Sequence, residues 1–189
     1  MLKRIQEYGK FVLIAGFKDV KITDVNYFIE NLRASAEPAS TQVFDADRVA
    51  GPEHLFFAAL NALKSFDQGN NISKTIDMES LLYASGQRQI EKAIDMLGVR
   101  SGTSDVALLI LGDDKSEVQG AEKRVEEFID GVRDDKVLDV RSREKVRRLM
   151  GLFNITDLEL KSLSEGGGAD YKTITNLIIE RVALLAVRR

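Results

Sequence analysis

Polar side chains able to hold a charged or hydrogen-bonding ligand gather between two short helices predicted in the middle of the chain. Lys74 and Arg88 carry positive charge, and Ser85 and Gln89 both donate and accept hydrogen bonds. Gly86 lies among them, and glycine readily adopts the left-handed backbone that ends many helices. Each side chain also has a simpler role. Arg88 can pair with an acidic residue of the next helix, Gln89 can cap a helix, and Lys74 can point into solvent.

Groups typical of enzymes and metal sites are scarce. The chain has no cysteine and only one histidine, His54, so thiol chemistry is excluded and any histidine-based site depends on one residue. Asp77 and Glu79 could form the acid–base pair of a small hydrolase, but residues two apart on a helix do not face the same way. The glycines at 166–168 form a predicted flexible loop without the lysine of a phosphate-binding loop. We therefore expect no catalytic residue, no metal and no cofactor.

The composition is typical of a single globular domain. Of the 189 residues, 44% are apolar and 30% are charged. A net charge of −3 creates no overall field that attracts nucleic acid, so any RNA contact must be a local patch. The apolar runs are far shorter than the ~20 residues of a membrane span, and the N-terminus does not resemble a signal peptide. We expect one domain over residues 1–189, located in the cytoplasm without membrane contact.

Alternating short strands and helices predict the fold class. Residues 10–17 form an apolar run of strand length, and residues 41–45 form a second strand. The helix between them carries an apolar stripe from Val25 to Leu32 after a plausible N-cap at Thr23. Residues 105–111 are apolar on both faces, which is typical of a central strand. The sequence thus predicts an α/β (mixed α+β) domain with a mixed sheet of about three to five strands covered by helices, beginning with a βαβ-like unit.

The helix that begins at Gly51-Pro52 is apolar around most of its circumference. Phe57 is the exception, because it falls within the polar arc of this helix. Either the helix is buried on most sides with one aromatic ring under a loop, or its wide apolar surface docks a partner. His54 has two corresponding interpretations: a hydrogen-bonded histidine at the rim of the core, or a contact with the partner.

Two further helices carry apolar faces that we expect to lie in the core. In the helix after Gly86, the apolar residues recur with helical spacing: Ile90, Ala93, Ile94 and Leu97. The last helix, predicted over residues 170–187, presents a similar set: Ile174, Leu177, Ile178, Val182, Ala183 and Leu185. Arg188 and Arg189 would end it at its negative pole.

The segment from residue 113 to residue 148 is densely charged and differs in character from its surroundings. Residues 117–129 fit a helix, and residues 136–140 are predicted to form an edge strand. Five basic residues then stand against one glutamate in RSREKVRR, residues 141–148. This run is either a solvated helix face or a basic anchor for phosphates.

Four stretches together resemble a known family. They are GPEHLFFAALNALKSF, SKTIDMESLLYASGQRQIEKAIDMLGV, DVALLILG and ERVALLAV, and they extend over most of the chain. The most specific is E-x-L-L-x-x-A-S-G-x-R-Q-I-x-x-A-I-x-x-x-G, from Glu79 to Gly98. In this order they resemble the kinase-binding accessory subunit of the KEOPS (EKC) complex, the TPRKB family, in its archaeal form.

The resemblance implies a non-catalytic α/β protein. Its partner would be the atypical small protein kinase/ATPase of the KEOPS complex, with the other KEOPS subunits contacted indirectly. That complex adds a threonylcarbamoyl group to the adenosine beside the anticodon of certain tRNAs. Within it, this subunit would bind and activate the kinase and help to recruit tRNA through its single-stranded 3′ CCA end.

The resemblance also suggests where the partners bind. Stacking surfaces and local positive charge hold single-stranded RNA. The RNA-binding residues would be Lys74, Ser85, Gly86, Arg88 and Gln89, with two residues of the last helix as a wall, Leu184 and Leu185. The kinase would dock on the helix over residues 53–66, at Leu55, Phe56 and Ala59. Two alternatives remain: a structural scaffold without RNA contact, and the carboxylate-dependent hydrolase.

Overall fold

One β-sheet forms the centre of the protein, whose computed structural model describes residues 1–163 and 171–185. Within these residues the strands are β1 (Leu2–Ile5), β2 (Lys10–Lys18), β3 (Ser40–Asp45), β4 (Val106–Gly112) and β5 (Val132–Arg133). Their order is β1-β2-β4-β3, with β5 also paired to β2. The predicted fold class is confirmed. Across the described residues every pairing is antiparallel, so the sheet itself is not mixed.

The first strand–helix–strand unit has a later strand inserted into it. β2 leads through α1 (Val25–Ala36) to β3, and β4 lies between β2 and β3, antiparallel to both. Ile14 of β2 faces Leu109 of β4, and Val43 of β3 faces Leu108. β2 and β3 therefore run in the same direction without touching, which is a split form of the predicted βαβ-like unit.

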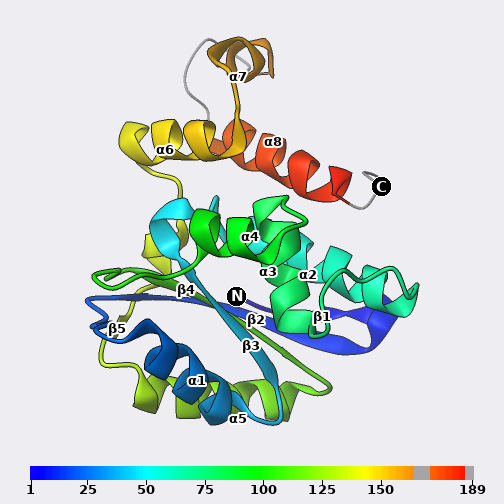
Figure 1. Cartoon of the computed structure of the whole chain (residues 1–189), viewed down its shortest axis with the longest axis vertical. Helices are drawn as coiled ribbons and strands as arrows, with labels where there is room; N and C mark the ends of the chain where they lie inside the picture. Colours follow the sequence, from blue (N-terminus) through cyan, green and yellow to red (C-terminus); the bar gives the residue numbers. More distant parts are fainter. Residues whose placement is uncertain (164–170, 186–189) are drawn as a thin grey trace.

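Helices cover both faces of the sheet (Figure 1). On one face lie α1 and α5 (Lys115–Phe128), and on the other lie α2 (Pro52–Asp67) and α3 (Ile76–Ser85), with α4 (Ile90–Leu97) beside α3. Beyond α2 and α3 are α6 (Arg143–Phe153), α7 (Asp157–Leu163) and α8 (Tyr171–Leu184). α8 packs on both α2 and α6. Among the described residues, no helix combines the length and the apolarity needed to cross a bilayer.

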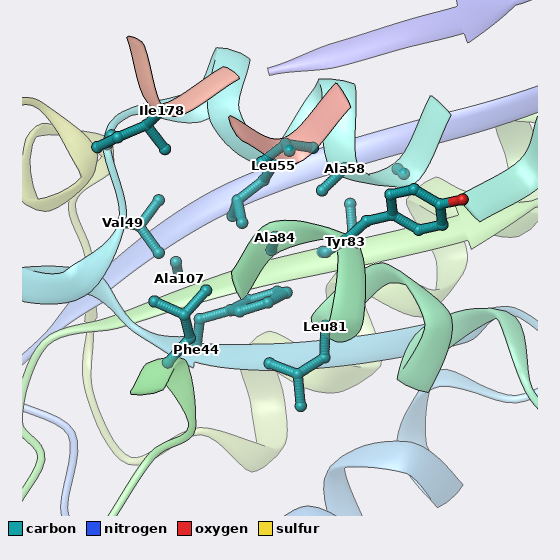
Figure 2. Close-up of a cluster of buried hydrophobic side chains, with 14 of the residues drawn as sticks. Phe44, Val49, Leu55, Ala58, Leu81, Tyr83, Ala84, Ala107 and Ile178 are labelled. Carbon is teal, nitrogen blue, oxygen red and sulfur yellow. The ribbon is translucent and has the colours of Figure 1, made fainter. Parts of the chain in front are cut away.

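β4 separates two apolar clusters, because successive side chains of a strand point to opposite faces. Leu108 and Ile110 join the cluster under α1 and α5, whereas Ala107 and Leu109 join the cluster under α2 and α3. All seven residues of β4 are buried, which confirms the predicted central strand. Figure 2 shows the second cluster, in which Phe44 of the sheet lies beneath side chains of α2 and α3.

The charged segment over residues 113–148 contacts the sheet between α5 and α6. The predicted helix is present as α5, but the predicted edge strand over residues 136–140 is wrong, because residues Asp135–Leu138 form a 3₁₀ turn, η3. The Asp135 carboxylate accepts a hydrogen bond from the backbone N–H of Gly16 in β2 at 2.8 Å. A Cβ on Gly16 would lie 2.7 Å from the Asp134 carbonyl oxygen. The backbone at Asp134 and η3 therefore packs closely on Gly16 of β2, and it does not form the predicted edge strand.

Two details of the predicted helix ends need correction. The N-cap of α1 is Asp24, whose carboxylate accepts the backbone N–H of Tyr27 at 3.0 Å, rather than Thr23. In α8, Ala183 is exposed, while the other apolar residues predicted to be buried are in the core. The predicted glycine loop at 166–168 and the terminal Arg188 and Arg189 lie outside the described residues.

Candidate nucleic-acid interface

The joint between α3 and α4 has the left-handed backbone conformation that its glycine predicts. Gly86 adopts the left-handed conformation, with φ +64°, at the C-cap of α3. Its N–H donates to the carbonyl oxygen of Tyr83, and the N–H of Gln87 donates to that of Leu82. These bonds close α3 and allow the chain to turn sharply into α4.

The structure separates the polar residues predicted around this joint. Ser85 is almost fully buried, and its hydroxyl donates to the Leu82 carbonyl and accepts the Gln87 N–H, so both of these bonds lie within the helix end. Arg88 and Gln89 are exposed beside Gly86. Lys74 is also exposed, but it precedes the ten-residue helix α3 and so lies about 15 Å from the joint along the helix axis.

A recess of about 160 Å³ opens beside the joint, between α2, α3 and the end of α8. We call it the joint recess. Asn61, Lys64 and Ser65 line it from α2, and Tyr83, Arg88 and Leu185 line it from the other side. Of the predicted RNA-binding residues, it brings together Arg88 and Leu185. Leu184 is 44% exposed, whereas Leu185 is buried, so Leu185 is the wall of the recess.

Sequence reasoning did not assign several residues of the joint recess to a site. The clearest are Lys64, which is exposed at the recess, and Tyr83, whose ring is buried. Burial raises the pKa of Tyr83, and a hydrogen bond with Ser65 and the positive charge of Arg88 partly offset this rise. A signal for the α2 side was present, because Asn61 and Lys64 belong to the polar arc of the helix. Only the fold shows that this arc meets the joint.

The apolar face of α4 is only half buried. Ala93 and Leu97 are in the core, as predicted, but Ile90 is 42% exposed and Ile94 is 44% exposed. α4 packs on α3 at the edge of the helical layer, so its apolar stripe is wider than the surface that covers it. The expectation that the whole face is core is therefore wrong.

The proposed kinase-binding residues on α2 are mostly internal. Leu55 and Ala59 are fully buried against the sheet side of the helix, so a partner cannot contact them on the surface. Phe56 is half-buried, and the Lys3 ammonium lies 5.0 Å from the centre of its ring. Phe57 is exposed and lines a cavity of about 550 Å³ between α2 and α8, together with Tyr171.

His54 is a buried core residue and makes no surface contact. Its Nδ1 accepts the backbone N–H of Ala50 at 3.2 Å, and its Nε2 lies 2.8 Å from the Ala84 carbonyl oxygen, to which it donates. Its ring meets that of Phe153 edge-on. Burial lowers the pKa of His54 to about 4, so the imidazole is neutral at physiological pH. The interpretation of His54 as a partner contact is therefore wrong.

The two carboxylates of the hydrolase alternative hold the structure together. Asp77 pairs with Arg33 of α1 at 2.8 Å. Glu79 is fully buried and accepts hydrogen bonds from Ser65 and from backbone N–H groups. Because they point to different partners, they do not form an acid–base pair. Among the described residues, no group of histidine or carboxylate side chains is placed to hold a metal ion.

Much of the basic run over residues 141–148 is engaged in ion pairs or hydrogen bonds within this chain. Arg141 pairs with Asp139, and Arg148 pairs with Asp47 and Glu144. Lys145 is buried and donates to the carbonyl oxygens of Val137 and Leu138. Three of the five basic side chains therefore bind other parts of this chain, which favours a structural role over a phosphate anchor.

Comparison with known proteins identifies the family. The family described as kinase binding protein CGI-121 matches residues 17–186. A regulatory protein Cgi121 from Methanocaldococcus jannaschii is 28% identical over 148 residues, which cover 78% of this chain and 84% of that protein. A KEOPS complex subunit Cgi121 from Pyrococcus abyssi is 36% identical over 67 residues, which cover 35% of this chain and 39% of that protein. These descriptions are of regulatory, kinase-binding proteins, in agreement with the predicted non-catalytic role. The chain belongs to the CGI-121 family of kinase-binding proteins.

Proposed function

We propose that this protein is the kinase-binding subunit of an archaeal KEOPS complex and that its joint recess holds the single-stranded 3′ CCA end of tRNA. The assembly is inferred from the family and from the description of the Pyrococcus abyssi relative. One observation supports RNA binding: Lys64 and Arg88 place two positive charges at a recess that also contains a tyrosine and side-chain amides. Proteins bind single-stranded RNA with this combination of groups.

Titration with tRNA tests the RNA-binding half of this proposal. We expect the protein to bind tRNA with an affinity that falls with added salt and that is lost when the 3′ CCA is removed. Arg88→Glu should weaken binding about tenfold. The matched control is Lys123→Glu, because Lys123 is an exposed cation on α5, on the opposite face of the sheet. Equal affinities of the wild-type protein for intact and trimmed tRNA would place the RNA contact away from the 3′ end, and the absence of tRNA binding would instead favour the scaffold without RNA contact.

The kinase is proposed to dock at the cavity between α2 and α8. Phe57 and Tyr171 expose aromatic surface there, and exposed apolar surface of this kind marks protein interfaces. Phe57→Glu should reduce capture of the kinase without unfolding the protein, since Phe57 is 37% exposed. Tyr27→Glu provides the control, because Tyr27 is 63% exposed on α1, behind the sheet. If both variants retain the kinase equally, the docking surface lies elsewhere.

A further inference from the structure

The two edges of the sheet differ in how they are covered. β3 forms one edge, and its residues Thr41, Gln42 and Val43 are buried, with α1 and α3 packed on the strand. The side-chain oxygen of Gln42 accepts the backbone N–H of Val43 at 3.0 Å, so this N–H is satisfied without a further strand. The edge at β3 is therefore closed by the protein itself.

β1 forms the opposite edge (Figure 1), and its register shows which backbone groups face outward. The N–H of Ile14 donates to the Met1 carbonyl oxygen at 2.8 Å, so residues 1, 3 and 5 direct their backbone groups toward β2. The N–H and C=O groups of Leu2 and Arg4 therefore point away from β2. Among the described residues no other strand pairs with β1, and an open edge of this kind can accept another strand.

Two cations flank this edge, one on each face of the sheet. Lys3 and Arg4 are exposed, and neither forms an ion pair within the described part of the chain. The Lys3 ammonium lies 5.0 Å from the centre of the Phe56 ring on α2. The Arg4 guanidinium lies 5.8 Å from the centre of the Phe11 ring, which packs against the cluster under α1 and α5. A strand added to β1 would therefore meet one positive charge on each of its faces.

The same cations disfavour a second copy of this chain as the added strand. In an antiparallel pairing of two β1 strands, the register that uses both outward-facing residues sets Leu2 of one copy against Arg4 of the other. The two copies of Lys3 then lie directly opposite each other, and like charges in that position are destabilising. A strand that carries acidic side chains meets attraction at the same positions.

We propose that the β1 edge binds an extended acidic segment of another protein, which joins the sheet as a further strand. Backbone hydrogen bonds to Leu2 and Arg4 hold the segment, as in other cases of β-strand addition. Two adjacent carboxylates of the segment lie on opposite faces, one beside Lys3 and the other beside Arg4. The half-buried ring of Phe56 gives the same strand an apolar contact on the α2 side. None of these residues lines the joint recess or the cavity between α2 and α8, so the inference does not depend on the proposed function.

Titration of the full chain with synthetic peptides, followed through the amide resonances of Leu2 and Arg4, tests this proposal. The probe is a capped hexapeptide with two adjacent glutamates at its centre, flanked on each side by valine and threonine. A second peptide replaces both glutamates by lysines, and a third keeps them but is N-methylated at both. We expect the glutamate peptide to slow hydrogen exchange of the two amides and to bind about tenfold more tightly than the lysine peptide at low salt. The N-methylated peptide should also bind about tenfold more weakly, because it lacks the N–H donors of a strand.

A charge reversal on the protein gives the matching experiment. The double variant Lys3→Glu, Arg4→Glu should prefer the lysine peptide over the glutamate peptide, because both side chains are exposed and their replacement leaves the backbone edge in place. The control is Lys123→Glu, which changes an exposed cation on α5 and should keep the wild-type preference. If the double variant does not fold, the comparison of the three peptides on the wild-type protein still decides the question.

Several results would overturn the proposal. Equal binding of the N-methylated and unmodified glutamate peptides would show attraction between charges without strand addition. A lysine peptide that binds as well as the glutamate peptide, or amides of Leu2 and Arg4 that do not respond to any peptide, would exclude an acidic strand at this edge. Dimers of the wild-type protein in which these two amides are protected would assign the edge to a second copy instead. None of these results concerns tRNA or kinase binding, so the proposed function would stand or fall separately.

Discussion

The only histidine of the chain should make the folded state sensitive to acid. His54 is fully buried, and its Nδ1 is occupied by the N–H of Ala50, so protonation would break that hydrogen bond and place a charge in the core. Its pKa is lowered from 6.5 to about 4, chiefly by burial. Between these values the unfolded chain carries more protons than the folded protein, so a fall in pH favours unfolding.

The size of the effect follows from the two pKa values. At about 1.4 kcal/mol for each pH unit between them, His54 should remove about 3 kcal/mol from the free energy of unfolding as the pH falls from 7 to 4. Above pH 7 its contribution is complete and no longer depends on pH. Such a loss is a large part of the 5–15 kcal/mol typical of a folded domain, so roughly this much destabilisation should be easy to measure.

Urea unfolding of the wild-type protein and of a His54→Asn variant, at several pH values from 4 to 7.5, isolates this contribution. The carboxylates titrate in both proteins, so the difference in their unfolding free energies reports on His54 alone. That difference should shrink by about 3 kcal/mol on acidification. Because the chain has one histidine, its imidazole proton resonance gives the pKa directly. A resonance that titrates near 6.5 in the folded protein would refute the reasoning.

Three further predictions concern stability. Leu55→Ala should lower the free energy of unfolding by about 2–5 kcal/mol in urea titrations because Leu55 is fully buried, whereas Tyr27→Ala on the surface of α1 should change it by less than about 1 kcal/mol. Gly86→Ala should lower the free energy of unfolding by about 1–2 kcal/mol in the same assay, because a residue with a Cβ is disfavoured at a φ of +64°. No atom lies within 3.4 Å of the added Cβ, so an unchanged free energy of unfolding would contradict this conformational argument. Lys145→Met should lower the free energy of unfolding by about 1–3 kcal/mol and speed amide hydrogen exchange in η3, because two carbonyl oxygens lose their donor. Unchanged exchange rates would show that other contacts hold η3 in place.

The three longest strands and most helices could be predicted because their apolar residues follow the period of each element. β4 is buried on both faces, and its unbroken apolar run indicates this directly. β1 was missed because it is four residues long and two of them are exposed, so it has no apolar run. The antiparallel order could not be predicted either, since β4 reaches the centre of the sheet only through contacts between segments distant in sequence.

The candidate site was predicted less completely than the fold. Left-handed geometry at Gly86 and the exposure of Arg88 follow from local sequence, and both are present. Burial of Leu55 and Ala59 could not be read from a helix that is apolar on most sides, because the pattern does not say which part faces the sheet. The role of Glu79 was hidden for a similar reason, since its hydrogen-bond partners come from α2 and from the connection before α3.

The structure explains why Phe57 lies within the polar arc of α2. Phe57, Asn61 and Lys64 are spaced four and three residues apart, so they form one stripe on the side of α2 that faces away from the sheet. The stripe begins in the cavity proposed for the kinase and ends in the joint recess, and its ends are about 10 Å apart along the helix. Tyr171 at the start of α8 lines the cavity, and Leu185, the residue that follows α8, lines the recess. A kinase docked at the proposed surface around Phe57 would therefore lie directly beside an RNA end held at the proposed site around Lys64.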